Sequence, residues 1–339
     1  MKYDAILLVS FGGPERPDEV MPFLENVLRG KNVPRERMLE VAEHYYDFGG
    51  KSPINDQNRR LIADLDAELA RHKTDLPVYW GNRNWHPMLA DTMRQMKSDG
   101  VTRALAFVTS AYSSYSSCRQ YCEDIARARE IIGEGAPVVD KIRAFHNHPG
   151  FVEANADRLR QALAKIPEER RAAAHLIYTA HSIPVAMAQS CTYQKQLNET
   201  ARLVAEKLGR QAWQVVYQSR SGPPSQPWLG PDIQDQLRKI RAGGGSRDIV
   251  VSPIGFVSDH MEIVFDLDTQ VLGLCAELGL QMVRAETVGT HPRFIEMIRE
   301  LIGERLDPGQ PRLTLGAMGP VPDVCPADCC SSPKRPVSI

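Results

Sequence analysis

The chain has 339 residues, of which 42% are hydrophobic and 24% are charged, and its 41 basic side chains nearly balance 42 acidic ones. This composition is ordinary for a globular protein, and the length predicts about two domains. It excludes a disordered chain, a collagen-like repeat and a coiled coil, and the balanced charge predicts no binding of nucleic acid.

Short apolar runs alternate with amphipathic stretches along the whole chain. The runs are rich in Val, Ile, Leu and aromatic residues, as in buried strands, and they cover residues 5–9, 77–80, 104–109, 175–179, 213–217 and 248–253. Between them, apolar residues at i+3 and i+4 spacing predict helices, most clearly over 58–72, 151–166 and 195–208. Alternation of this kind predicts an α/β fold with mostly parallel sheets.

A turn-rich junction at residues 146–150 divides the chain near its middle, with three predicted strands on either side. We therefore predict two similar, doubly wound domains over residues 1–148 and 149–306. From residue 307 onward the composition changes to Pro, Gly, Cys and Ser, which predicts an irregular, cysteine-containing tail over 307–339.

The sequence also bears on the compartment. The longest apolar runs are about five residues, against the ~20 that a membrane-crossing helix needs, so no integral membrane contact is expected. Asp4 interrupts the apolar run that a signal peptide would require. These features favour a cytoplasmic protein whose seven cysteines stay reduced.

Ligands in open α/β sheets bind beyond the carboxyl ends of the strands, so the residues just after each apolar run are the candidates for a site. His181 follows one such strand. An imidazole there could bind a metal or move a proton near neutral pH. The alternative is a hydrogen-bonded side chain that only closes the strand.

An acidic segment follows the last strong strand. On a helix, Asp259, Glu262 and Asp266 would fall at i, i+3 and i+7 on one face, from which Asp268 departs. Three stacked carboxylates repel each other, and a hard divalent cation would relieve that repulsion. The alternative is an acidic first turn that favours the helix dipole, which explains Asp266 poorly.

Hydroxyl-rich segments occur at 109–121 and 49–53, where they could bind carboxylate groups or serve as helix caps. The glycines at 12–13 lack the spacing of a dinucleotide motif, which disfavours a nucleotide-dependent oxidoreductase.

Three cysteines, Cys325, Cys329 and Cys330, lie within six residues of the tail. In a reduced compartment such spacing suggests metal or cluster ligation, with a fourth thiol from Cys118 or Cys122. Cys191 and Cys275 are less favoured. Zinc and iron–sulfur are equally compatible with this spacing.

Five segments, taken together and in this order, resemble the ferrochelatase family. They are LLVSFGGP at 7–14, GGKSPI at 49–54, TAHSIP at 179–184, QSRSGP at 218–223 and PIGFVSDHME at 253–262. The resemblance extends over about residues 3–306. It implies two flavodoxin-like (Rossmann-like) domains with a porphyrin between them, and insertion of Fe²⁺ into that porphyrin with release of two protons.

The resemblance also implies roles for individual residues. His181 and Glu262 would hold the metal and accept or relay protons, and Asp266 would extend the acidic path. The expected porphyrin-binding residues are Ser52 and Tyr121, which match propionate-binding positions, with Arg29, Tyr45 and Phe11 as neighbours.

Arg29, residues 118–121 and the cysteine tail look most like the actinobacterial-type branch, which uses coproporphyrin III and some of whose members carry a 2Fe–2S cluster. This implies coprohaem as the product and a cluster on the four thiols of Cys118, Cys325, Cys329 and Cys330. Phe11 stands where some relatives have a tyrosine that ligates product iron, and Asn84 where others have a histidine.

Two alternatives remain open at this point. One is a ferrochelatase that uses protoporphyrin IX, and the other is a non-enzymatic tetrapyrrole or metal carrier on the same fold. The expected partners are coproporphyrin III, ferrous iron and a downstream coprohaem-handling enzyme, and we expect a monomer.

Overall fold

The computed structural model describes residues 2–30, 33–326 and 328–331. Within this part the strands form two four-stranded sheets, in which each strand runs parallel to its neighbours. The first sheet has the order β2-β1-β3-β4 and the second β6-β5-β7-β8, so the two halves repeat one topology. The strands are β1 (Ala5–Ser10), β2 (Val78–Asn82), β3 (Arg103–Val108), β4 (Val138–Lys141), β5 (His175–His181), β6 (Gln214–Gln218), β7 (Asp248–Ser252) and β8 (Gln281–Arg284). The predicted α/β, doubly wound fold is confirmed.

Six of these strands were predicted, but the edge strands β4 and β8 were missed. Each is four residues long, begins with an exposed residue and is otherwise only half-buried. Both end in a basic residue, so they lack the continuous apolar character that identifies a central parallel strand. The prediction of three strands in each half was therefore wrong, because each sheet has a fourth strand at its edge.

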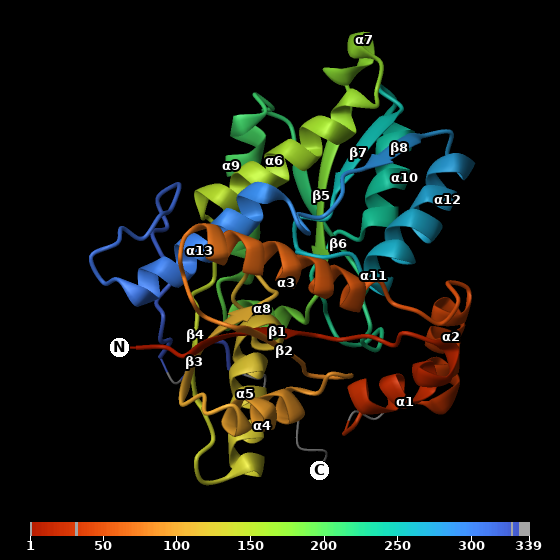
Figure 1. Cartoon of the computed structure of the whole chain (residues 1–339). Coiled ribbons are helices and arrows are strands. Elements are labelled where there is room, and N and C mark those ends of the chain that lie inside the picture. Colours follow the sequence, from red (N-terminus) through yellow and green to blue (C-terminus); the bar gives the residue numbers. More distant parts are fainter. Residues whose placement is uncertain (1, 31–32, 327, 332–339) are drawn as a thin grey trace.

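The helices connect and cover the two sheets (Figure 1). In the first half they are α1 (Pro17–Val27), α2 (Arg35–Tyr46), α3 (Ile54–Arg71), α4 (Leu89–Ser98), the π-helical turn η1 (Tyr115–Arg119) and α5 (Gln120–Ile132). In the second they are α6 (Pro149–Ala164), α7 (Glu168–Arg171), α8 (Val185–Gln189), α9 (Tyr193–Lys207), α10 (Ile233–Gly243), α11 (Met261–Val264), the π-helix η2 (Asp266–Val271), α12 (Leu272–Glu277) and α13 (Pro292–Leu306).

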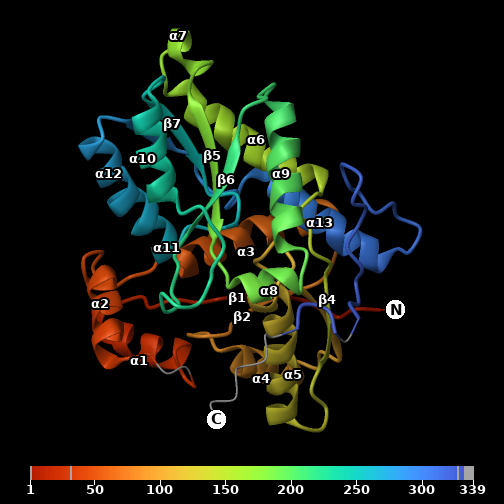
Figure 2. The same ribbon diagram turned by 180° about the vertical axis from the view of Figure 1, so that it is seen from behind.

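One continuous hydrophobic core lies between the two sheets. It joins Leu8 and Phe107 of the first sheet to Tyr178 of the second through Phe151 on α6 and Phe294 on α13. The last helix α13 contacts both α3 and α6, and Figures 1 and 2 show these helices between the two sheets. Helices α4 and α5 cover the outer face of the first sheet, and α10 to α12 that of the second. The two halves are thus packed into one body. The boundaries at residues 148 and 306 stay a prediction.

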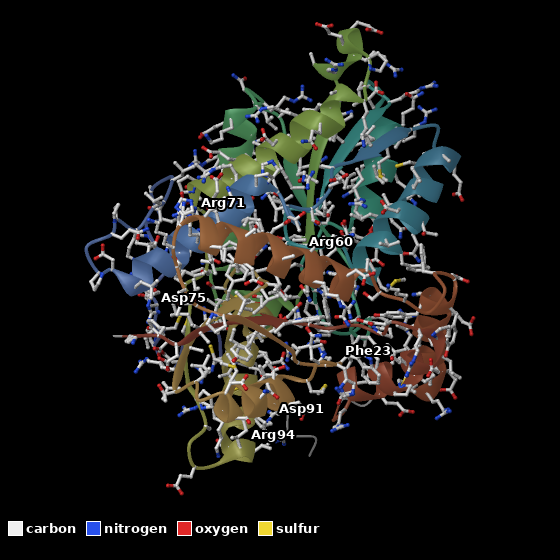
Figure 3. All side chains as sticks on the ribbon, viewed as in Figure 1. Phe23, Arg60, Arg71, Asp75, Asp91 and Arg94 are labelled. Carbon is white, nitrogen blue, oxygen red and sulfur yellow. The ribbon has the colours of Figure 1, made fainter. Side chains whose placement is uncertain are left out.

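Helices α1 and α2 stand at one side of the first half and have a small core of their own. Phe23, labelled in Figure 3, is buried in it and makes edge contacts with the rings of Tyr45 and Trp85. This pair of helices carries Tyr45 toward the second half.

The described part of the tail, 307–326 and 328–331, contains no helix or strand, and the remainder of the predicted 307–339 segment lies outside the described residues. Fully buried Arg143 forms two 2.7 Å hydrogen bonds to the carboxylate of Glu304 and donates to the carbonyl of Leu313 at 2.9 Å. Asn147 accepts from the Leu315 amide and donates to the Gly319 carbonyl. These contacts attach the tail to the core.

No helix in the described part of the chain combines the length and apolar character needed to span a bilayer.

His146 provides a test of this core. It is 1% exposed, and neither ring nitrogen has a hydrogen-bond partner among the described residues. Burial lowers the pKa of His146 to about 4; the charge of Glu199 opposes this shift, and the charge of Arg143 adds to it. The ordinary value in an unfolded chain is about 6.5, so the unfolded state binds more protons between about pH 4 and 6.5.

We predict that the free energy of unfolding falls as the pH drops through this window, because protonation then favours the unfolded chain. A His146→Phe variant should lose roughly 2 kcal/mol less between pH 7 and pH 5 than the parent protein does. Urea denaturation at the two pH values measures this difference. Exposed His86→Phe is the control and should leave the pH dependence unchanged. An equal loss in His146→Phe and the parent would contradict a buried, neutral His146.

Candidate functional site

The carboxyl ends of β5 and β6 bring the candidate residues together. His181 is the last residue of β5 and lies opposite Gln218, the last residue of β6. The loop after β7 packs closely on β5, since a Cβ on Gly255 would lie only 2.5 Å from the Cβ of Ala180. Only glycine allows this approach, which places the segment that carries Glu262 beside His181.

His181 and Glu262 form an ion pair, with 3.3 Å between Nε2 and Oε1. The other ring nitrogen, Nδ1, contacts the carbonyl of Ser182 and thereby fixes the ring, while the Tyr193 hydroxyl donates to the carbonyl of His181 at 3.0 Å. Burial alone would lower the pKa of His181. The charge of Glu262, the hydrogen bonds to Glu262 and Ser182 and the charge of Asp266 outweigh it and raise the pKa to about 9.

Glu262 lies in the first turn of α11, and Asp266 begins η2 one turn later. The Gln218 amide donates to the Glu262 carbonyl at 2.6 Å, and the Ser219 hydroxyl donates to the Asp266 carboxylate. Burial raises the pKa of Asp266 to about 6, as does the charge of Glu262, against the Ser219 hydrogen bond and the charge of His181. Asp266 is therefore ionised at neutral pH, yet close enough to its pKa to accept and release protons.

The predicted face of three stacked carboxylates was wrong for Asp259. The helix begins only at Met261, with His260 as its cap, so Asp259 precedes the helix. It binds Arg284 at 3.1 Å, and its amide donates to Gln57 of α3 at 2.8 Å. Of these three carboxylates, only those of Glu262 and Asp266 act on His181.

The α2 helix approaches this group from the first half. Burial and the negative charge of Glu262 both raise the pKa of Tyr45, which places its hydroxyl near that carboxylate. His44 stacks on Phe265, with ring centroids 3.6 Å apart. Tyr45 thus lies within the electrostatic influence of Glu262.

A second group lies at the strand ends of the first sheet. Phe11 follows β1 and is 38% exposed. The guanidinium of Arg83 lies 6.0 Å from the Phe11 ring and 4.8 Å from the Tyr121 ring, and it pairs with Asp124 at 3.0 Å. Burial raises the pKa of Tyr121, opposed by the charge and hydrogen bond of Arg83.

The remaining predicted residues are more dispersed. Ser52 is buried against the Gly13 backbone, where an added Cβ would lie 2.7 Å from the Ser52 Cβ. Arg29 is exposed beyond the end of α1. Asn84 accepts from Asn26 through its carbonyl, and its buried side-chain nitrogen has no partner among the described residues.

Sequence reasoning assigned no individual role to several side chains that the structure places around these groups. Gln218 donates to the backbone carbonyl of Glu262, and Ser219 donates to the Asp266 carboxylate. Arg83 stacks on Tyr121, and His260 caps α11 with its ring nitrogen 3.9 Å from Glu262. Three of these four directly follow or end a strand, so their position was a usable signal. The partners that they select depend on packing.

The tail returns to η1, so that thiols far apart in the sequence come together. Hydrogen bonds from Cys122 and Cys325 lower the pKa of Cys118, and the Lys141 ammonium acts in the same direction against burial. Cys329 and Cys330 lie with their sulfur atoms 3.5 Å apart. Burial and the nearby thiols of Cys329, Cys118 and Cys191 raise the pKa of Cys330.

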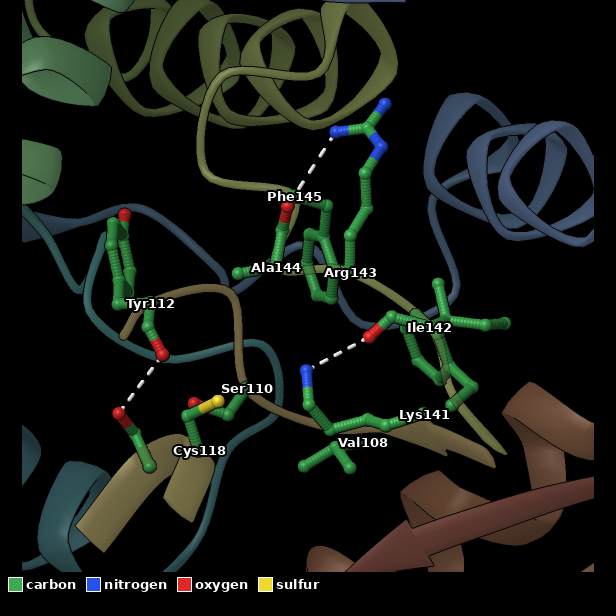
Figure 4. Close-up of a pocket in the computed structure, with 11 residues that line it drawn as sticks. Val108, Ser110, Tyr112, Cys118, Lys141, Ile142, Arg143, Ala144 and Phe145 are labelled. Carbon is green, nitrogen blue, oxygen red and sulfur yellow. Dashed lines mark hydrogen bonds between the residues drawn. The ribbon is translucent and has the colours of Figure 1, made fainter. Parts of the chain in front are cut away.

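The donor chemistry of these thiols suits a soft metal or an iron–sulfur cluster. In the described part of the chain, however, no three His, Cys, Asp or Glu side chains are already arranged around a possible metal ion. Beside Cys118 lies a small cavity of about 10 Å³, which Figure 4 shows between Ser110, Tyr112 and Lys141. It has room for about one water molecule.

A family model described as "Ferrochelatase" matches residues 3–306. The ferrochelatase of Rhodopirellula baltica is 58% identical over 335 residues, which cover 98% of this chain and 95% of that protein. The coproporphyrin III ferrochelatase of Nocardia farcinica is 50% identical over 351 residues, covering 100% of this chain and 99% of that protein. That of Streptomyces coelicolor is 49% identical, with 97% and 93% covered.

Among solved structures, SirB from Bacillus subtilis with Fe³⁺ has a TM-score of 0.54 at 13% identity, covering 90% of this chain and 98% of that one. CbiX, described as the terminal enzyme for biosynthesis of siroheme in denitrifying bacteria, has a TM-score of 0.52 at 14% identity, with 89% and 100% covered. At these identities the likeness concerns the fold alone, and it agrees with the α/β, doubly wound fold predicted above.

Proposed function

The chain belongs to the ferrochelatase family, and from this premise we propose that it inserts Fe²⁺ into coproporphyrin III to form coprohaem. The observation that carries the proposal is the pair of His181 Nε2 and Glu262 Oε1, 3.3 Å apart at the end of β5. Relatives that are 49–50% identical over nearly their whole length are named coproporphyrin III ferrochelatases. The product would pass to an enzyme that handles coprohaem.

Insertion breaks two pyrrole N–H bonds as iron–nitrogen bonds form, and releases two protons. His181 suits the role of proton carrier, because Nδ1–H donates to the Ser182 carbonyl and the Nε2–H of the imidazolium faces the Glu262 carboxylate, which can take up its proton. With a pKa of about 9 the imidazole is protonated at neutral pH, and it would become a proton acceptor once a cation bound at Glu262 has displaced that proton. Glu262 would share the metal with His181, as a nitrogen and an oxygen donor suit Fe²⁺.

Asp266 would then carry protons away from the pair. It lies one helical turn beyond Glu262, and its pKa is raised to about 6. A carboxylate that is ionised at neutral pH but holds a proton briefly is suited to relay. Ser219 would fix it in place through its hydrogen bond.

For the porphyrin itself we propose contacts with Phe11, Tyr45, Ser52, Tyr121 and Arg29. The closeness of Tyr45 to Glu262 and the exposed ring of Phe11 support this proposal. A four-carboxylate porphyrin also needs cations, and the exposed guanidinium of Arg29 offers one.

We further propose that Cys118, Cys325, Cys329 and Cys330 bind a 2Fe–2S cluster. Support comes from the contact of Cys325 with Cys118 and from the sulfur atoms of Cys329 and Cys330 at 3.5 Å. The Lys141 ammonium would balance part of the negative charge of four thiolates. A bound cluster supplies one-electron chemistry, and no step of metal insertion passes through it.

The substrate assignment is tested by supplying coproporphyrin III and protoporphyrin IX side by side under anaerobic conditions. We predict faster iron insertion into coproporphyrin III, because its four carboxylates can pair with cations at the site. Loss of the porphyrin absorption spectrum measures the rate. Faster insertion into protoporphyrin IX would contradict the substrate assignment. Binding of a porphyrin without insertion of iron would indicate a non-enzymatic carrier.

The metal pair is tested by two substitutions. His181→Ala and Glu262→Gln should each lower the insertion rate about 100-fold or more, since each removes a proton acceptor and metal ligand. Glu277→Gln, an exposed carboxylate at the end of α12, is the control and should retain the parent rate. Circular dichroism checks the fold of each variant. A near-parent rate in folded His181→Ala would refute the assignment.

The cluster is tested by colour. Anaerobically purified protein should be red-brown with visible absorption, and Cys118→Ser should abolish that absorption because one thiolate ligand is lost. Cys275→Ser, within the core of the second half, is the control and should keep it. Stoichiometric zinc in a colourless protein would contradict the cluster. Bleaching by Cys122→Ser but not Cys118→Ser would contradict Cys118 as the fourth ligand.

A further inference from the structure

Arg284, the last residue of β8, joins two carboxylates that flank the site. Its Nε and Nη2 bind the two oxygens of Asp268 at 2.5 and 2.7 Å, and its Nη1 binds Asp259 at 3.1 Å. The side chain is only 16% exposed. The same Nη1 also donates to the Ala285 carbonyl, so all three guanidinium nitrogens are engaged.

These two carboxylates stand at either end of the catalytic segment. Asp259 precedes Glu262 by three residues, and Asp268 follows Asp266 by two. Arg284 therefore spans α11 and the start of η2. This segment contains Glu262 and Asp266. It neutralises the outer two carboxylates and leaves the inner two facing His181.

The first half of the chain holds the same segment from the other side. Gln57 of α3 accepts from the Asp259 amide at 2.8 Å and donates to the Asp259 carboxylate at 3.3 Å. Asp259 is thus fixed by an amide from one half and a guanidinium from the other. Freed of Arg284, the segment would carry four carboxylates within ten residues, and their repulsion would favour its displacement.

We propose that Arg284 is a positioning residue for metal insertion, which clamps Asp259 to Asp268 so that Glu262 stays opposite His181. The inference rests on the proposed ferrochelatase function. It requires a planar fork as well as a positive charge, since one ammonium group cannot bind Asp268 through two atoms and Asp259 through a third.

The test compares Arg284→Met and Arg284→Lys with the parent protein in anaerobic iron insertion. Arg284→Met should lower kcat about 10-fold or more, because a small displacement of a reacting group is costly, while the KM for coproporphyrin stays within about twofold. Arg284→Lys should recover only part of kcat. The matched control is Arg158→Met, which removes a guanidinium of similar exposure, 18%, whose ion pair with Glu286 lies outside the segment 259–268.

The outcomes separate this inference from the function on which it rests. No insertion by the parent protein would overturn the proposed function. If the parent inserts iron but Arg284→Met and Arg158→Met have equal kcat, the proposed clamp is wrong while the proposed function stands. Full recovery of kcat in Arg284→Lys would also contradict the clamp, because a positive charge alone would then explain the role of Arg284. If Arg284→Met does not fold, Asp268→Asn removes the two-point contact and should still lower kcat at constant KM. An unchanged kcat there would also overturn the clamp.

Discussion

The ion pair between His181 and Glu262 is the interaction on which the proposed chemistry depends. Burial at the end of a strand would hold the imidazole neutral, but a carboxylate at 3.3 Å reverses this and raises its pKa to about 9. A cation that binds the carboxylate therefore competes with the proton on the same imidazole. One pair of side chains can thus hold a proton before metal arrives and donate a nitrogen and an oxygen afterwards.

This pair depends on contacts that cross between the halves of the chain. The Tyr112 hydroxyl of the first half donates to the Ile254 carbonyl at 2.8 Å, just before the segment that carries Glu262. Gln57 fixes Asp259 from the same side, and Tyr45 lies near Glu262. Since the two sheets share one core through α3, α6 and α13, these contacts between the halves rest on a continuous packed interior.

Much of this arrangement could be predicted from the sequence. His181 was found because it ends an apolar run, and parallel strands place such residues at one edge of a sheet. Glu262 and Asp266 were found because unneutralised carboxylates at helical spacing are unfavourable without a partner. The same reasoning misplaced Asp259, because the cation that neutralises it lies 25 residues away on an edge strand too short and polar to be recognised.

The tail is a second place where contacts between residues far apart in the sequence limit what the sequence alone can predict. Its composition predicts an irregular segment that would need a ligand to order it, yet buried Arg143 and Asn147 hold it through Leu313, Leu315 and Gly319. The ion pair of Arg143 with Glu304 spans 161 residues of sequence, so no local pattern reveals it. Because these anchors use no thiol, they bring Cys325 back to Cys118 by protein contacts alone. A group bound there would therefore find Cys118 and Cys325 already in contact, but it would have to bring further thiols around itself, since no three such side chains of the described residues surround a common point.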